Sequence, residues 1–217
     1  MKRFIKRLGL GLIPKKSGPV AITLHHVDEK DFEWLGGILD TLSVDFDFMD
    51  PIEMEDISNI AVSYNASEMI SLLSPGHDFD RPDAIDPKRH LTVGINDINF
   101  ETDGLISPDE QHVLDVIEFA RSWDQKKPLL IHCWFGVSRS PAAALISALA
   151  IEPDQDDFEL ANRLREASPS ATPNRRIIEI GDRLLNRGGK LLQAVNAIGR
   201  GREASQGSPF KLPLRKS

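Results

Sequence analysis

The sequence predicts an α/β protein with a central, mostly parallel sheet flanked by helices. Short apolar runs that suit strands buried on both faces occur at 69–73, 91–95 and 129–131. Segments with a helical spacing of apolar residues stand between and after these runs, and parallel strands require such crossovers. The chain has 217 residues, 41% of them hydrophobic and 27% charged, which is enough for one such domain with extensions.

Residues 1–57 are predicted to form an N-terminal extension, to which no chemistry is assigned. Within it the patterns predict a strand at Pro19–Leu24, a helix at 32–42 and a strand at 44–50. The basic, briefly apolar start is followed by lysines and lacks a small-residue cleavage site, so we expect no secretion signal. We also expect no transmembrane segment, because no apolar run approaches the roughly 20 residues that a membrane span needs.

Residues 58–198 are predicted to form the main domain. Its first strand, 69–73 (MISLL), is interrupted by the Ser-Pro-Gly turn at 74–76. The next strand, 91–95 (LTVGI), leads directly into Asn96 and Asp97. Polar residues at that position are noteworthy because α/β sheets place their ligands at the carboxyl ends of the strands.

A helix is predicted over 107–123. Ser107 is expected to cap it, Pro108 to open it and Glu110 to complete a capping box. One broad apolar side would pack on the sheet, so the helix would return the chain to the next strand in a right-handed crossover. His112 is expected to be a surface or cap residue.

The remaining helices follow the strand at 129–131. The segment 141–151 is almost entirely Ala, Leu and Ile, so it is predicted to be a buried central helix, and 156–167 is amphipathic. A last helix is predicted from Thr172-Pro173-Asn174 through Leu185. Residues 199–217 are rich in Gly, Ser, Pro and basic residues and are predicted to be a disordered, flexible basic tail.

The formal net charge of −7 hides an uneven distribution. Residues 1–16 carry six basic and no acidic side chains, and residues 186–217 carry seven basic and one acidic, so the body between them is strongly acidic. An acidic body argues against specific nucleic-acid binding, and the basic ends are expected to be solvated. The single cysteine excludes an intramolecular disulfide and indicates a reducing, cytoplasmic setting.

The stretch with the clearest chemistry is Pro128–Ala142, PLLIHCWFGVSRSPA. A buried strand, a seven-residue loop with Gly136 in its middle and a helix start would form an anion nest, to which the helix N-terminus adds about half a positive charge. Cys133 would lie at its floor, where amide groups favour thiolate over thiol. The planar fork of Arg139 could grip two oxygens of a tetrahedral dianion. A nucleophilic sulfur beneath an anion cradle predicts attack on phosphorus.

These residues resemble a known family signature. HCWFGVSRS is similar to the His-Cys-x5-Arg-Ser signature of the cysteine-dependent protein tyrosine phosphatases of bacterial type, including the dual-specificity branch. The match covers His132, Cys133, Gly136, Arg139 and Ser140. The resemblance implies a phosphotyrosine-phosphatase-like fold and hydrolysis of phosphate monoesters without a metal or other cofactor.

The resemblance also implies roles for the matched residues. Cys133 would be the nucleophile that forms a phosphocysteine intermediate, and Arg139 would bind the phosphoryl group and stabilise its transition state. His132 would favour ionisation of the thiol, and Ser140 would donate to the sulfur as it leaves in the second step. The remaining cradle would consist of Trp134, Phe135, Gly136, Val137 and Ser138 together with Arg139.

A general acid is needed because thiolate attack expels an alkoxide or phenoxide. The family supplies it from an aspartate some thirty-odd residues before the cysteine, and Asp97 and Asp103 precede Cys133 by 36 and 30 residues. The end of a strand and an Asn-Asp context favour Asp97, while Asp103 stays open and either could be a simple turn residue. Asn174 resembles a dual-specificity feature that braces the phosphate loop, or it is an ordinary helix-start residue.

Phosphotyrosine in proteins is the first substrate expected. None of the five residues inside the loop is basic, whereas relatives that act on inositol lipids or RNA 5′ ends carry extra Lys or Arg there. An aromatic lining suits a single phosphate on an aromatic ring, with phosphoserine, phosphothreonine and small phosphomonoesters open. The oligomeric state is not indicated by the sequence.

Four alternatives compete with this enzymatic interpretation. The first is a catalytically impaired module that binds phosphorylated partners. The second is a rhodanese-type sulfurtransferase, although that family usually has one residue fewer between Cys and Arg. The third is a thioredoxin-coupled arsenate reductase, which needs further cysteines. The fourth is an inert core cysteine.

Overall fold

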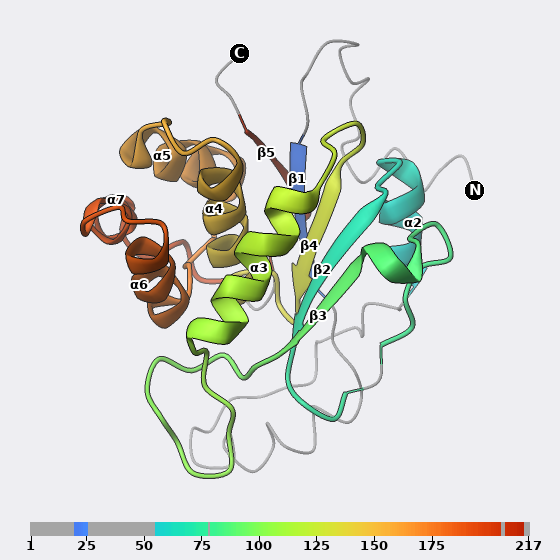
Figure 1. Ribbon diagram of the computed structural model, residues 1–217, viewed down its shortest axis with the longest axis horizontal. Helices are drawn as coiled ribbons and strands as arrows, with labels where there is room; N and C mark the ends of the chain where they lie inside the picture. Colours follow the sequence, from blue (N-terminus) through green and yellow to red (C-terminus); the bar gives the residue numbers. More distant parts are fainter. Residues whose placement is uncertain (1–19, 26–54, 78, 205–206, 215–217) are drawn as a thin grey trace.

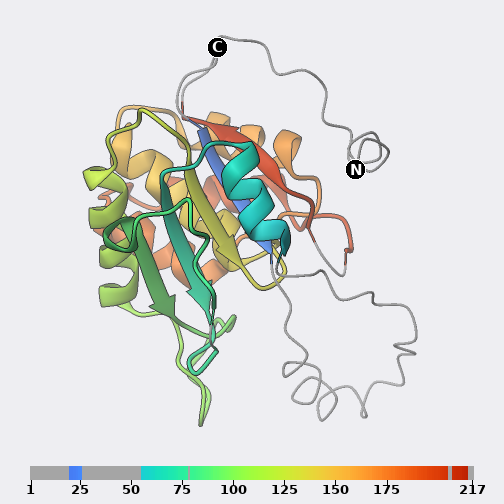
Figure 2. The same ribbon diagram turned by 90° about the vertical axis from the view of Figure 1, so that its right-hand side faces the viewer.

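The computed structural model describes residues 20–25, 55–77, 79–204 and 207–214. In this part of the chain a five-stranded sheet has the order β3-β2-β4-β1-β5 (Figure 1). Helix α2 covers one face of the sheet, and the other helices lie on the opposite face (Figure 2). The predicted α/β class, with a mostly parallel sheet flanked by helices, is confirmed.

Four neighbouring strands are parallel and the fifth is antiparallel. The strand predicted over Pro19–Leu24 is confirmed as β1, and it pairs with β4, so the predicted N-terminal extension supplies a strand of the central sheet. The helix predicted at 32–42 and the strand at 44–50 lie outside the described residues. The parallel strands are β1 (Val20–His25), β2 (Glu68–Leu73), β3 (His90–Gly94) and β4 (Leu129–Cys133), and the antiparallel strand is β5 (Phe210–Pro213).

Burial explains why the central strands have continuous apolar runs. Every residue of β2 and β4 is buried, because helices cover both faces of the sheet. On the larger side the core is formed with α4 (Arg139–Ile151), which is buried at every position up to Ala150. On the smaller side, α2 (Glu55–Ser63) packs Ile57 and Ala61 against Met69 of β2 and Leu130 of β4.

Helix α3 (Glu110–Ser122) begins later than the sequence predicts. Asp109, and not Ser107, is its N-cap, and the capping box is completed by His112: the His112 amide donates to Asp109 Oδ1 at 3.0 Å, and the Asp109 amide donates to His112 Nδ1 at 3.3 Å. The predicted cap was wrong because a carboxylate directly before the helix replaces the hydroxyl two residues earlier. The predicted cap role of His112 is confirmed.

The helical layer ends with three further helices. These are α5 (Asp157–Ala167), α6 (Arg175–Leu184) and α7 (Lys190–Ile198), and a short 3-10 turn, η1 (Pro87–Arg89), precedes β3. Helix α7 was not predicted. It starts after Gly189, where φ is +85°, and the Asp182 carboxylate of α6 caps it by accepting from the amides of Gly189 at 2.6 Å and Leu191 at 2.9 Å.

The prediction of a disordered tail over 199–217 was wrong for residues 207–214. Strand β5 pairs antiparallel with β1, beside it in Figure 2, and alternation buries Phe210, Leu212 and Leu214 in the main core. The prediction relied on the glycine- and proline-rich composition of the tail and overlooked the alternation of apolar residues over the five residues 210–214. None of the helices in the described part of the chain has both the length and the apolar character that a bilayer span requires.

Candidate active site

The loop of residues 133–139, here called the signature loop, joins β4 to α4. Cys133 is the last residue of β4 and lies between β1 and β2 in register with His25 and Leu72. Arg139 is the first residue of α4. Gly136 has a φ of +66°, which favours glycine at the bend. The strand-loop-helix predicted from the sequence is therefore confirmed, at the carboxyl edge of the parallel strands.

Cys133 and Ser140 come together inside the protein. Cys133 is only 1% exposed, and its Sγ lies 3.2 Å from the hydroxyl of Ser140, which is fully buried in the first turn of α4. This distance is within hydrogen-bonding range for sulfur. The Ser140 hydroxyl can therefore donate to a sulfur that carries negative charge.

Arg139 is buried, and one of its N–H groups makes no hydrogen bond within the described part of the chain. Its side chain donates from one terminal nitrogen to the carbonyl of Ile95 at 2.7 Å, and only 2% of the residue is exposed. Its Nε makes no hydrogen bond to any described residue, and the nearest carboxylate oxygen, Asp97 Oδ2, is 4.0 Å away. A buried N–H without a partner is costly, so this guanidinium is suited to an anion that would accept from it.

Asp97 lies at the signature loop, just beyond the end of β3. Its Oδ1 accepts from the Ser138 hydroxyl at 2.7 Å and from the Asn174 side-chain amide at 2.8 Å. Asp103, the other candidate acid, is exposed farther along the same connection. Of the two aspartates, the structure brings Asp97 to Arg139 and the loop.

Three carbonyl groups of the signature loop point outward. Phe135 O accepts from the Gly207 amide at 2.8 Å, Val137 O from the Thr172 amide at 2.6 Å, and Ser138 O from the Asn174 amide at 3.1 Å. In a trans peptide the carbonyl and the following N–H point in opposite directions, and the described residues contain no cis peptide. The amides that follow these carbonyls therefore face the inside of the loop, as an anion nest requires.

A chain of polar side chains runs behind the nucleophile. The fully buried His132 places Nε2 2.5 Å from the Ser71 hydroxyl, and the same hydroxyl lies 2.7 Å from His90 Nε2. Burial and, secondarily, the charge of Arg81 lower the pKa of His90 from its ordinary value of 6.5 to about 4. Sequence reasoning missed Ser71 and His90, although a polar residue within the apolar strand 69–73 was a usable signal.

Two aromatic contacts flank this chain. The ring of Phe79 lies 4.7 Å from that of His132, and His77 packs edge-on against Trp134 with 4.6 Å between ring centroids. Trp134, which was predicted to line the anion site, is 5% exposed and is thus packed inward.

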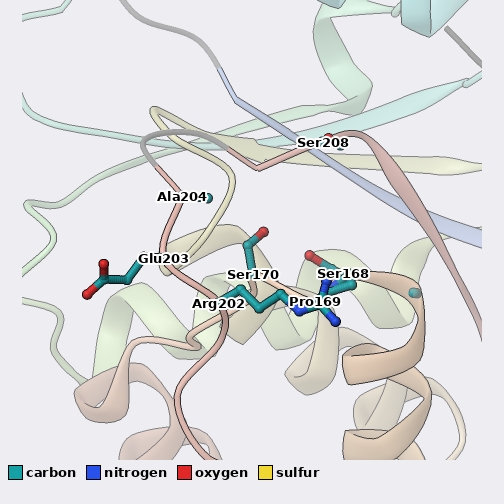
Figure 3. Close-up of a pocket in the computed structure, with 8 residues that line it drawn as sticks. Ser168, Pro169, Ser170, Arg202, Glu203, Ala204 and Ser208 are labelled. Atoms are coloured by element: carbon teal, nitrogen blue, oxygen red, sulfur yellow. The ribbon is translucent and has the colours of Figure 1, made fainter.

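The structure has a pocket of about 280 Å³, whose lining residues are drawn in Figure 3. It lies between residues 167–170 and the segment that contains Arg202 and Ser208, next to the Thr172 and Gly207 amides that bind the loop carbonyls. No residue of the signature loop lines it. Within the described chain, no group of three or more His, Cys, Asp or Glu side chains is placed to hold a metal ion.

No protein-family model and no curated protein sequence matches the chain. Solved structures do. The PTP-2 phosphatase of Cydia pomonella matches with a TM-score of 0.44 and 19% identity, over 59% of this chain and 77% of that one. A mouse protein assigned as a dual specificity phosphatase, complexed with zinc tungstate, matches with a TM-score of 0.44 and 18% identity, over 68% and 82%. Tk-PTP in its active form matches with a TM-score of 0.36 and 16% identity, over 62% and 87%.

These TM-scores lie below 0.5, so the similarities carry no information about the chemistry of the site, which depends on its own residues. These three structures are named as a PTP-2 phosphatase, a dual specificity phosphatase and Tk-PTP, and the residues from His132 to Ser140 resemble the signature of the protein tyrosine and dual-specificity phosphatases.

Proposed function

We propose that the protein hydrolyses phosphate monoesters, with phosphotyrosine in proteins as its substrate, through a phosphocysteine intermediate on Cys133. The observation that carries this proposal is the buried guanidinium of Arg139, whose Nε has no hydrogen-bond partner among the described residues, beside a loop with three outward carbonyls. A phosphoryl dianion would accept from this Nε and from the inward amides of the loop.

In the first step the Cys133 thiolate attacks phosphorus and the bond to the leaving oxygen breaks. Asp97, in its protonated form, gives that oxygen a proton, so that a phenol and not a phenoxide departs. Arg139 binds the equatorial oxygens, where charge is spread in the transition state. The product of this step is a phosphocysteine and a free hydroxyl compound.

In the second step water attacks the phosphocysteine. Asp97, now a carboxylate, takes a proton from the water, and the phosphorus–sulfur bond breaks. The Ser140 hydroxyl, 3.2 Å from Sγ, donates to the departing sulfur and so makes it a better leaving group. His132 lies directly before the nucleophile, and its Nε2 is held by Ser71. Orthophosphate is released, and the thiolate and the protonated acid are regenerated.

Phosphotyrosine follows from the lining of the loop. The side chains between Cys133 and Arg139 include no basic one, so none of them would meet a second phosphate. Trp134 is packed inward, and the half-buried Phe135 is the aromatic side chain of the loop that would contact the ring of the substrate. The reaction needs a reduced thiol, so we place the protein in the cytoplasm.

The test of the proposal compares wild type with Cys133→Ser on p-nitrophenyl phosphate and a phosphotyrosyl peptide. Wild type should turn over and be inhibited by vanadate, which resembles five-coordinate phosphorus. Cys133→Ser should bind the peptide without cleaving it, because a hydroxyl is a far weaker nucleophile than a thiolate. A burst of one phosphate per protein without turnover would instead indicate a module that binds phosphorylated partners, and turnover by Cys133→Ser would contradict the mechanism.

The assignment of the acid is tested separately. Asp97→Asn should lower kcat by roughly 10²- to 10⁴-fold on a phosphotyrosyl peptide and less on p-nitrophenyl phosphate, whose leaving group needs little protonation. The matched control is Asp103→Asn, an exposed aspartate of the same loop, which should leave both rates unchanged. A loss on Asp103→Asn with none on Asp97→Asn would reverse the two roles.

A further inference from the structure

The connection of residues 95–109, here called the Asp97 loop, has few apolar anchors. Two of its large hydrophobic side chains point to solvent: Phe100 is 78% exposed and Ile106 is 46% exposed. Polar contacts join the two arms of the loop: the Asn96 amide donates to Ile106 O, and the Ile106 amide donates to Asn96 Oδ1, both at 2.8 Å. Ile95 at its start and Pro108 near its end are buried, but hydrophobic burial contributes little between them, so the position of that part of the loop depends on polar contacts with the rest of the protein.

Arg176, the second residue of α6, contacts the loop at three places. Its amide donates to Asn99 Oδ1 at 3.3 Å, and its Nε donates to Pro108 O at 2.6 Å. Its terminal nitrogen lies 3.5 Å from Glu101 Oε1. One residue thus joins the outgoing and the returning arm of the loop to the start of α6.

The other end of the loop is held by residues of the site itself. Arg139 donates to Ile95 O at 2.7 Å, and Asn174 donates to Asp97 at 2.8 Å. Arg176 follows Asn174 by two residues, so the same helix start fixes both the carboxylate and the loop that carries it. The Arg176 side chain is 26% exposed, so its charge-assisted bond to the Pro108 carbonyl is partly shielded from water, whereas Glu101 is 85% exposed and adds little.

We propose that Arg176 is a positioning residue for the Asp97 acid, an inference that rests on the proposed function and adds a residue to it. General acid catalysis depends on the distance between the carboxyl group and the leaving oxygen, and an error of about 1 Å can cost roughly 10²-fold in rate. Arg176 does not touch the reacting atoms. It acts by keeping both arms of the Asp97 loop against α6.

The experiment compares Arg176→Ala with Arg175→Ala in the full-length protein. Arg175 is the matched control because it is the neighbouring arginine. Its side chain is 58% exposed and contacts Glu179 on its own helix. The substrates are phenyl phosphate, with a poor leaving group, and p-nitrophenyl phosphate, with a good one. Arg176→Ala should lower kcat by roughly 10- to 100-fold on phenyl phosphate and by less than about threefold on p-nitrophenyl phosphate, with KM unchanged on both. Arg175→Ala should match wild type.

Two further readouts separate positioning from a general loss of folded protein. In the double variant Asp97→Asn/Arg176→Ala, loss of Arg176 should have no further effect, because the acid that it positions is gone. Hydrogen exchange over residues 96–109 should accelerate in Arg176→Ala and not in Arg175→Ala, since the Asn96 and Ile106 amides depend on the closed loop.

Each outcome decides a different claim. Equal losses on the two substrates, or additive losses in the double variant, would overturn the positioning role. Unchanged exchange in Arg176→Ala would show that the loop does not depend on this residue. If wild type hydrolysed neither substrate, the proposed function would fail and the positioning role with it, while the exchange data would still show whether Arg176 holds the loop.

Discussion

Asn174 uses both ends of its side-chain amide. Oδ1 accepts from the Ile177 amide at 3.0 Å and so caps α6, while Nδ2 donates to Asp97 at 2.8 Å. The sequence left a helix-start role and a role in bracing the phosphate loop as alternatives. The structure has the helix cap, while the other end of the side chain contacts Asp97, and the contact with the loop comes from the Asn174 backbone amide, which donates to Ser138 O at 3.1 Å. The cap follows from a local pattern, Pro-Asn before a helix, whereas the contact with Asp97 joins residues 77 positions apart and no local pattern contains it.

His90 predicts a pH dependence of stability. Its pKa in the folded protein is about 4, below its ordinary value of 6.5, so the unfolded chain binds more protons between these values. The free energy of unfolding should therefore fall as the pH drops through this window, by about 1–2 kcal/mol once solvent screening is allowed for. Urea unfolding of wild type and His90→Gln at pH 7.5 and 4.5 measures this.

The Gln variant keeps a polar group for Ser71 but does not titrate. It should lose less stability than wild type between the two pH values. Equal losses in the two proteins would show that His90 is not the group responsible.

Among the elements, those with their own apolar pattern were predictable and those that depend on distant partners were not. β2, β4 and α4 were predicted because β2 and β4 are buried at every residue and α4 at every residue but its last, and continuous apolar runs in the sequence reflect this burial. Helix α7 was missed because its cap is a carboxylate from α6, and the glycines before it resemble an ending. β5 was missed because its stability comes from pairing with β1, nearly two hundred residues away.

The candidate site divides in the same way. The residues from His132 to Ser140 are contiguous, so one stretch of sequence contained nucleophile, bend and arginine. The groups that support them, Ser71, Thr172 and Gly207, come from three separate segments, and only the fold brings them to His132 and the signature loop.

A buried ion pair links α5 to the chain that follows α6, and its loss should be costly to the fold. Arg187 binds Asp157 through two bonds, from Nε to Oδ1 at 3.0 Å and from a terminal nitrogen to Oδ2 at 2.6 Å, and the Asp157 side chain is 3% exposed. The hydrogen bond to Asp157 raises the pKa of Arg187, so the guanidinium keeps its charge at all ordinary pH values. Arg187→Ala would strand a buried carboxylate and should cost about 3–5 kcal/mol.

The control is the exposed pair Arg175–Glu179, where Arg175→Ala should cost only about 0.3–0.5 kcal/mol. Denaturant unfolding of the two variants measures the difference. Similar costs for both would mean that the Asp157 carboxylate is better solvated than its burial indicates.

At the scale of the whole molecule, the C-terminal segment joins the sheet to the site. Residues 210–213 extend the sheet beyond β1 (Figure 2). Lys211 places its ammonium 4.6 Å from the ring centroid of Tyr64, which directly follows α2. Just before β5, Gly207 donates to Phe135 O of the signature loop, and a Cβ on Gly207 would lie 3.0 Å from Gly136 O. The C-terminal segment thus contacts the edge of the sheet, the chain beside α2 on the smaller face, and the signature loop.

This arrangement predicts the effect of shortening the chain. A protein that ends at Ile198 loses Phe210, Leu212 and Leu214, which are 7%, 0% and 2% exposed. Their burial contributes about 1.5–3 kcal/mol each, so the loss approaches the roughly 5–15 kcal/mol of a typical domain. The shortened protein should be largely unfolded by circular dichroism at 25 °C, whereas one that ends at Leu214 should unfold in urea at the wild-type midpoint. Leu212→Ala, which leaves the Gly207 contact in place, should cost about 2–5 kcal/mol. A chain ending at Ile198 that unfolded at the wild-type midpoint would show that the edge of β1 is stable without β5, and the C-terminal segment would then be an accessory to the fold.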